Sequence, residues 1–264
     1  MIVSGNIDKM ETRLTDTVEY RLPIGEERVL MNEFLGKPIR MLYEHVINCT
    51  VCGRKTNKSF AQGLCYPCFV SSPENAECII RPELCRGHLG EGRDPQWELD
   101  HHVKPHYVYL AASSDIKVGV TRNTQVPTRW IDQGADAAIL FAETPNRYLA
   151  GVIEVAMKNF LTDKTDWRKM LKGETTQRNL MEVKHELLDK LSDELKPYFV
   201  ADDSITHIKY PVLSFPEKVS SVGFEKEEII EGELKGIKAQ YLIFKDNRVI
   251  NIRAHGGYKI TLEA

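Results

Sequence analysis

Four cysteines in two C-x2-C pairs constrain this chain more than any other feature of its sequence. Cys49 and Cys52 stand in CTVCGR, and Cys65 and Cys68 stand in CYPCF after a gap of twelve residues. Each pair can present two thiolates from one tight turn, and two such turns complete a tetrahedron around Zn2+. Because four cysteines close the coordination sphere, the sequence predicts a zinc ribbon with a structural rather than a catalytic metal.

A second group of candidate ligands follows in CIIRPELCRGHLGEGRDPQWELDHH. It contains Cys78, Cys85, His88, His101 and His102. Cys85 and His88 have the three-residue step of a ligand pair, and Cys78 could add a third bond. Two interpretations are open. These residues bind a second zinc, which could hold a water and be catalytic if only three protein ligands bind it, or they are isolated buried cysteines and surface histidines.

The composition fits a cytosolic protein. The 264 residues are 42% hydrophobic, enough for one large domain or two to three small ones, and no run approaches the ~18 apolar residues of a membrane span. The first residues, MIVSGNIDKMETR, lack the basic start and apolar run of a secretory signal. We therefore expect a cytoplasmic location, where cysteines are more often metal ligands than disulfides. The oligomeric state stays open.

The charge of the chain gives little overall attraction for nucleic acid, since the net charge is -3. Residues 101–180 differ, with 11 Lys and Arg against 8 Asp and Glu. This local excess permits a phosphate-binding face, and a solvated face with interspersed acids explains it equally well. The basic residues concerned are Arg122, Arg129, Arg147, Lys164, Arg168, Lys169 and Lys172.

Local patterns predict an α+β fold in which both ends of the chain join one β unit. Residues 1–48 and 199–264 are rich in strand-like stretches, 49–104 form the zinc-binding segment, and 105–198 form an α/β domain. The α/β elements expected are a hairpin at 107–122, a short helix after Pro127, a strand in DAAILFAE, and helices in NRYLAGVIEVAMKNFL and 176–195. The middle segments would then be insertions in the β unit.

The order of these α/β elements resembles the core of the GIY-YIG nuclease superfamily. The resemblance covers roughly residues 105–170 and consists of a hairpin, a helix with an arginine, a strand and a helix with a glutamate. The matching residues are Tyr107-Val108-Tyr109, Lys117-Val118-Gly119, Arg129 in TRWIDQGA and Glu154 in AGVIEVAMK. With its CxxC pairs, CxxH step, RWIDQGA and DKTDWRKML, the whole chain also resembles a little-characterised bacterial and archaeal family of unknown function.

The nuclease resemblance implies roles for these side chains. Tyr109, assisted by Tyr107 or Lys117, would orient or deprotonate the attacking water. Arg129 would grip the phosphate oxygens in a fork that lysine cannot copy. Glu154 would hold Mg2+ or Mn2+, because Mg2+ commonly binds one or two carboxylates and several waters.

The match has departures. Tyr107 stands where the superfamily's first motif has glycine, and Lys117 stands where the second has tyrosine, so Lys117 could act as a base only with a depressed pKa. The late asparagine of the superfamily has two candidates, Asn159 and Asp163. Gly119 would let a neighbouring helix or ligand approach the second strand closely.

Each of these residues also has a structural interpretation. Tyr107 and Tyr109 can be ordinary strand aromatics, Arg129 can pair with Asp132 on a helix surface, and Glu154 can be solvated. Three functions therefore remain open. They are a metal-dependent endonuclease, a non-catalytic RNA- or DNA-binding module associated with a ribosome or tRNA, and a zinc-stabilised scaffold for a protein partner.

Overall fold

The structure is a computed structural model that describes residues 1–161 and 166–264, so Asp163 and Lys164 lie outside the described residues. The chain divides into two compact units. Unit 1 comprises residues 1–71, 171–173 and 209–264, and unit 2 comprises residues 72–170 and 174–208. The division after Ser71 falls inside the predicted zinc-binding segment, 49–104. The two candidate ligand groups therefore belong to different units.

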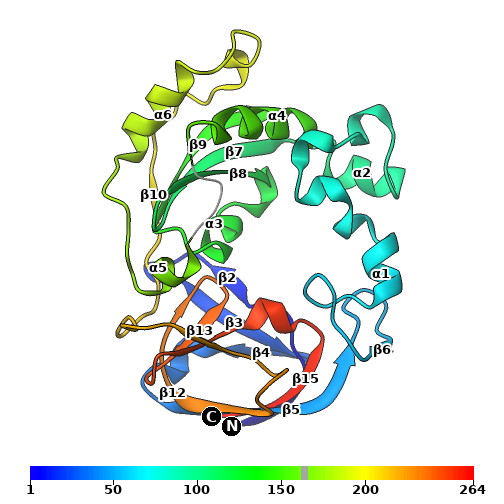
Figure 1. Cartoon of the computed structure of the whole chain (residues 1–264), viewed down its shortest axis with the longest axis vertical. Coiled ribbons are helices and arrows are strands. Elements are labelled where there is room, and N and C mark those ends of the chain that lie inside the picture. The colour runs from blue at the N-terminus through cyan, green and yellow to red at the C-terminus, as the bar shows by residue number, and fades with distance from the viewer. Residues whose placement is uncertain (162–165) are drawn as a thin grey trace. The chain divides into compact units, whose positions relative to one another are not determined.

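Unit 1 is built on an eight-stranded sheet with the order β1-β15-β5-β12-β13-β14-β11, and the short β6 pairs with β5. The first strand, β1, pairs antiparallel with the last, β15, so the predicted union of both chain ends in one β unit is confirmed (Figure 1). The pairing of β11 with β14 is parallel, which makes the sheet mixed. The strands are β1 Ile2–Asn6, β5 Pro38–Asn48, β6 Lys55–Thr56, β11 Ser220–Val222, β12 Ile229–Lys238, β13 Tyr241–Phe244, β14 Arg248–Asn251 and β15 Tyr258–Glu263.

A second, three-stranded sheet lies in unit 1, with β3 between β2 and β4. Its strands are β2 Glu11–Arg13, β3 Glu19–Ile24 and β4 Glu27–Leu30. Alternate residues of β3, namely Tyr20, Leu22 and Ile24, are buried, as expected for a strand with one face in the core.

Turns decide where the C-terminal strands end. The KDNR stretch forms the predicted turn between β13 and β14, where Asn247 has a φ of 67°. The stretch GIKAQYLIF reads as one strand in the sequence, but Ala239 has a φ of 55° there. The left-handed backbone at Ala239 divides the stretch into the end of β12 and β13, which pair as a hairpin.

Unit 2 contains a four-stranded antiparallel sheet with the order β10-β9-β7-β8. Its strands are β7 His106–Ala112, β8 Ile116–Arg122, β9 Ala137–Thr144 and β10 Thr206–His207. The predicted hairpin is present as β7 and β8, in a register that pairs Tyr109 with Gly119. The predicted strand in HIKYPVLSF is reduced to β10. Pro211 has no N–H to donate, and the N–H of Val212 turns back to the carbonyl of Tyr210 at 2.9 Å.

Helices cover both faces of the unit 2 sheet (Figure 1). The α-helices of both units together are α1 Tyr66–Ser71, α2 Pro95–His101, α3 Thr128–Asp132, α4 Arg147–Lys158, α5 Trp167–Leu171 and α6 Leu180–Leu188. One face buries Val108, Leu110, Val118 and Val120 with apolar residues of α4 and α6. The other face carries Tyr109, whose ring lies 6.0 Å from that of Trp130 in α3.

Helix caps fix the start of both long helices. Asn146 accepts a hydrogen bond from the N–H of Leu149 at 3.0 Å, so α4 begins at Arg147. Asn179 caps α6 in the same way, and the helix ends at Leu188, so it is shorter at both ends than the predicted 176–195. Across the described ranges, no helix has the length and apolar character needed to cross a membrane.

Candidate metal centres and an arginine pocket

The four C-x2-C cysteines converge in unit 1. Their Sγ atoms all lie within 4.8 Å of one another, and Cys52 Sγ is 3.7 Å from Cys65 Sγ. A tetrahedral zinc site with Zn–S bonds of about 2.3 Å has S–S edges of about 3.8 Å. The tetrad is therefore geometrically suited to Zn2+, as the spacing predicts.

Backbone geometry explains how these cysteines are presented. Gly53 has a φ of 70° and its N–H donates to the carbonyl of Cys49 at 2.8 Å, which closes the first turn. Burial alone would raise the pKa of Cys49, but N–H groups of Cys65, Cys52 and Val51 lower this pKa to about 6. Arg54 Nε also donates to Cys52 Sγ at 3.1 Å. Thiolates supported in this way are the form that binds metal.

A second group of ligand-type side chains lies in unit 2. Cys78, Cys85, Glu98 and His102 bring one ligand atom each to within 4.8 Å of the others, and all four are buried. His88, which the sequence analysis grouped with the two cysteines, is not a member. Its ring stacks on Tyr148 at a centroid distance of 4.7 Å.

Helix α2 and its C-terminal cap supply Glu98, which sequence reasoning missed, and His102, which it named as a candidate without selecting it from its neighbours. Asp94 caps the helix and Pro95 occupies its first turn. Glu98 and His102 are four residues apart, so they share one helix face, and Nδ1 of His102 contacts Oε2 of Glu98. The signal was present as ELDHH in the sequence, but it needs the position of the helix cap to be interpreted.

The hairpin residues of the predicted catalytic set lie on one face of β7 and β8. Tyr107 and Tyr109 alternate on β7, and they pair with Thr121 and Gly119 of β8. Tyr109 is 0% exposed, and its hydroxyl donates to Gln133 Oε1 at 2.9 Å. A Cβ at Gly119 would lie 2.6 Å from the Tyr109 hydroxyl oxygen. The group that approaches Gly119 closely is therefore this tyrosine.

Charged residues surround the buried tyrosine. Burial and the nearby Arg129 lower the pKa of Lys117 to about 8. Burial raises the pKa of Glu154, which is 8% exposed and forms an ion pair with Lys158 at 3.3 Å. Arg129 hydrogen-bonds to Tyr109, whose pKa is raised mainly by burial.

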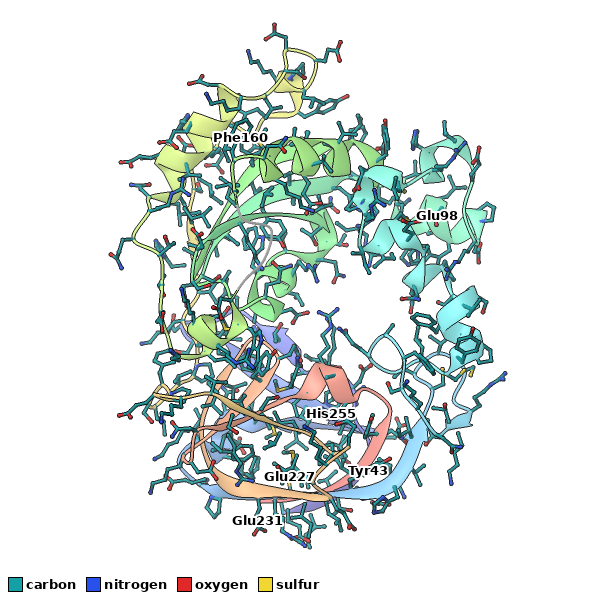
Figure 2. The ribbon with its side chains drawn as sticks, in the orientation of Figure 1. Tyr43, Glu98, Phe160, Glu227, Glu231 and His255 are labelled. Atoms are coloured by element: carbon teal, nitrogen blue, oxygen red, sulfur yellow. The ribbon has the colours of Figure 1, made fainter. Side chains whose placement is uncertain are left out.

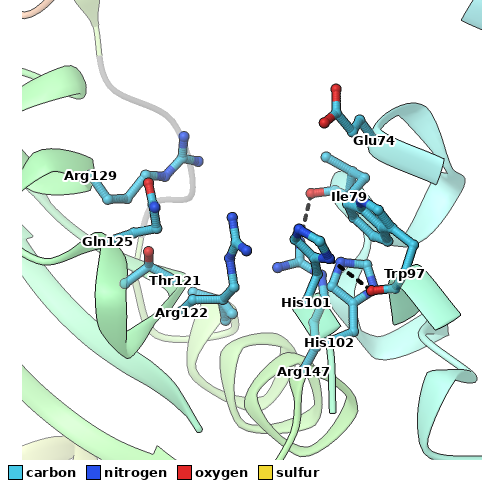
Figure 3. A pocket seen from close by; sticks show the side chains of 11 residues that line it. Glu74, Ile79, Trp97, His101, His102, Thr121, Arg122, Gln125, Arg129 and Arg147 are labelled. Carbon is cyan, nitrogen blue, oxygen red and sulfur yellow. Dashed lines mark hydrogen bonds between the residues drawn. The ribbon is translucent and has the colours of Figure 1, made fainter. Parts of the chain in front are cut away.

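An open pocket of about 290 Å3 lies beside this cluster in unit 2 (Figure 3). Arginine and aromatic side chains dominate its lining. The lining residues are Glu74, Ile79, Trp97, His101, His102, Val120, Thr121, Arg122, Gln125, Arg129 and Arg147. We call this cavity the arginine pocket.

The walls of the arginine pocket are held by specific contacts. The Arg147 side chain donates from Nε to the carbonyl of Cys78 at 2.9 Å and from Nη2 to that of Ile79 at 2.8 Å. The rings of Trp97 and His101 stack at 4.1 Å with an interplanar angle of 9°. This stack presents a flat aromatic surface beside the guanidinium groups (Figure 3).

Only some of the predicted catalytic and phosphate-binding residues lie at this pocket. Arg129 lines it, whereas Tyr109 and Glu154 are not among the described residues that do. Of the basic residues counted in the sequence, Arg122 and Arg147 join Arg129, while Arg168 lies over the Trp167 ring at 4.3 Å. Asn159 is exposed at the end of α4.

Comparison with known proteins gives a family and no function. Searches of curated proteins and of solved structures find no significant match. A family model described as "Protein of unknown function (DUF2797)" matches residues 36–260, which is most of the chain and includes both ligand groups and the arginine pocket. The chain therefore belongs to the DUF2797 family.

Proposed function

We propose that this protein binds nucleic acid, with a phosphate and a base of a single strand held in the arginine pocket of unit 2. The observation that carries the proposal is the convergence of Arg122, Arg129 and Arg147 beside the stacked Trp97 and His101. Guanidinium groups bind phosphate oxygens in a planar fork. An aromatic face stacks on any base, and such stacking contributes about 1–3 kcal/mol per base.

The charge and size of the pocket agree with this ligand class. Three arginines face a single carboxylate, Glu74, among the lining residues. A volume of about 290 Å3 lies at the small end of small-molecule sites, which span roughly 300–1,000 Å3. The pocket therefore suits one nucleotide-sized group better than a duplex.

Binding is favoured over cleavage by the burial of the groups that a nuclease would use. The Tyr109 hydroxyl is occupied by Gln133 and has no exposed surface. The Glu154 carboxylate, proposed to hold Mg2+ or Mn2+, is paired with Lys158. Arg129 lines the pocket, but neither of these two groups is among the described residues that line it.

Cleavage remains the second candidate, because burial and Arg129 lower the pKa of Lys117 to about 8. A base with such a pKa can accept a proton near neutral pH. The order of β7, β8, α3 with Arg129, β9 and α4 with Glu154 is also the order on which the resemblance to GIY-YIG nucleases rests.

Fluorescence anisotropy with labelled single-stranded RNA and DNA at low salt tests the proposal. Arg129→Ala and Arg122→Ala should each weaken binding by about tenfold or more, since a hydrogen bond to a charged group contributes about 1.5–3 kcal/mol, and the loss should be similar for all sequences. Trp97→Leu should weaken it by a similar factor. The matched control is Arg178→Ala, which removes the same charge from an exposed site outside the pocket and should leave the affinity unchanged.

Two results would redirect the proposal. Equal losses for Arg178→Ala and Arg129→Ala would mean diffuse charge attraction rather than a pocket. Cleavage that requires Mg2+ or Mn2+ and disappears in Glu154→Gln would support the nuclease instead. If the wild-type protein binds no single-stranded RNA or DNA at low salt, both the binding proposal and the nuclease proposal are excluded.

A protein-interaction role has its own supporting observation in unit 1. The unit 1 part of the zinc-binding segment, residues 49–71, exposes the apolar side chains of Val51, Tyr66 and Val70. Exposed apolar groups that cluster are common at protein interfaces. A specific protein that co-purifies with the wild-type chain, and is lost in a Tyr66→Ser and Val70→Ser variant, would support this role.

A further inference from the structure

The ligand-type group of unit 2 has the dimensions of a metal site. Cys85 Sγ is 3.6 Å from His102 Nδ1, Cys78 Sγ is 3.9 Å from the same nitrogen, and Cys85 Sγ is 3.9 Å from Glu98 Oε2. With Zn–S bonds of about 2.3 Å and Zn–N or Zn–O bonds of about 2.1 Å, a tetrahedral site has mixed edges of about 3.6 Å. These three separations are close to these edges, whereas Nδ1 of His102 and Oε2 of Glu98 are in direct hydrogen-bonding contact and would have to move apart to bind one ion.

Burial makes this group unusual among clusters of polar side chains. Cys78, Cys85, Glu98 and His102 are 8%, 2%, 2% and 3% exposed. A buried carboxylate beside two buried thiols is unfavourable unless a cation compensates it. Within the group, Glu98 Oε2 contacts Nδ1 of His102 and the Cys85 thiol, while the nearby Arg147 directs its Nε and Nη2 to the carbonyl oxygens of Cys78 and Ile79. A cation among the four ligand atoms would compensate the carboxylate together with two deprotonated thiols.

Two glycines, Gly87 and Gly92, pack closely against Glu98, whose position in the chain is labelled in Figure 2. A Cβ at Gly92 would lie 2.4 Å from Glu98 Cγ, and one at Gly87 would lie 3.0 Å from Glu98 Oε2. The N–H of Gly87 also hydrogen-bonds to the Cys85 thiol. Outer hydrogen bonds of this kind orient the ligands of metal centres.

We propose that Cys78, Cys85, Glu98 and His102 bind a second Zn2+ ion, and that this ion fixes one wall of the arginine pocket. Two thiolates with an imidazole and a carboxylate are donors that suit zinc. Four protein ligands leave no position for water or substrate, so the metal is structural. His102 lines the pocket, and Arg147 links the pocket to the backbone of Cys78. This zinc site does not depend on what the pocket binds.

Metal analysis of the purified full-length chain tests the site. Wild-type protein should contain two zinc ions per chain, and the variant with Cys78→Ser and Cys85→Ser should contain one. His88→Ala is the matched control, because His88 lies in the same segment but stacks on Tyr148; it should retain both ions. A wild-type content of one zinc, lost only with Cys49→Ser and Cys52→Ser, would overturn the proposal.

Cobalt spectroscopy keeps the test decisive if the cysteine variants fail to fold. Glu98→Gln has the same shape as the wild-type residue, and circular dichroism can verify its fold. In the Co2+-loaded protein this substitution should shift the ligand-field bands and lower the affinity of one ion by at least about 10- to 100-fold, because that range already applies to the loss of a residue that only hydrogen-bonds to a ligand. Unchanged bands and affinity in Glu98→Gln would exclude Glu98 as a ligand and overturn the four-residue site.

Discussion

The two ligand groups of this chain differ in how the protein brings their ligands together. In unit 1, a short turn presents Cys49 and Cys52, the start of α1 presents Cys65 and Cys68, and Cys52 is exposed. In unit 2, Cys78, Cys85, Glu98 and His102 are all buried and come from a helix and the irregular segment before it. The first group is specified by local backbone geometry, whereas the second depends on the packing of a whole segment.

This difference has a physical consequence. A turn that holds its own ligands needs little support, since Gly53 and backbone N–H groups already orient the thiolates. A buried group with mixed charges needs close packing on all sides, as the approach of Gly87 and Gly92 to Glu98 shows. We therefore expect the first site to be accessible and the second to be closed.

Removal of the four-cysteine site should have the largest effect on the folded state. In the variant with Cys49→Ser and Cys52→Ser, the zinc content should fall by one ion per chain, because two of its four thiolates are lost. Structural zinc contributes about 10 kcal/mol or more to the folding of small zinc domains. Limited proteolysis should then cut the segment 49–71 at least about tenfold faster. Unchanged cleavage of this segment would show that the sheet alone holds it.

Lys117 differs from the buried ligand group of unit 2, because its buried charge disappears when the side chain loses a proton. Its pKa in the folded state is about 8, below the ordinary value of 10.5. The unfolded state therefore binds more protons between these values, and stability rises with pH from about 8 to 10.5. Lys117→Met should increase the free energy of unfolding at pH 7 by about 3 kcal/mol.

Urea denaturation at several pH values checks this prediction. The advantage of Lys117→Met over wild type should shrink above pH 8 and vanish near pH 10.5. An advantage that is independent of pH would show that better packing, and not the charge, is the cause.

Two glycine substitutions test whether the ligand group of unit 2 is more closely packed than that of unit 1. Gly92→Ala should destabilise unit 2 by about 1–3 kcal/mol, because its Cβ would overlap Glu98. Gly53→Ala meets no atom within 4 Å and should cost only the left-handed backbone term of about 1 kcal/mol. Chemical denaturation with bound zinc measures both. If Gly53→Ala lowers the free energy of unfolding more than Gly92→Ala does, the ligand group of unit 2 is not the more closely packed one.

The rate of metal loss should show the smallest difference. A chelator should remove zinc in two phases, with the partly exposed four-cysteine site first and the buried site at least about tenfold later, which corresponds to about 1.4 kcal/mol of opening free energy. A colorimetric zinc indicator follows both phases. A single phase with equal rates would mean that burial does not protect the second site.

Sequence reasoning was most successful where one local rule decides the outcome. The C-x2-C spacing identified the four cysteines that converge, and the pattern of the hairpin and of α4 identified elements that are present. It failed for His88, because a three-residue step does not determine which way a histidine points. It also missed Trp97 and Glu98, and it did not select His102 from the neighbouring histidines, because the packing of α2 sets the neighbours of these residues.

The sequence alone determined the zinc turn, the union of both chain ends in one β unit, and the order of hairpin, helices and strand in unit 2. These features follow from local spacing, periodicity and turn chemistry. Only the tertiary structure decided that Tyr109 is buried against Gly119, that Arg122, Arg129 and Arg147 share a pocket, and that Glu98 and His102 join two cysteines. Burial and convergence depend on contacts between segments far apart in the chain, which no local pattern specifies.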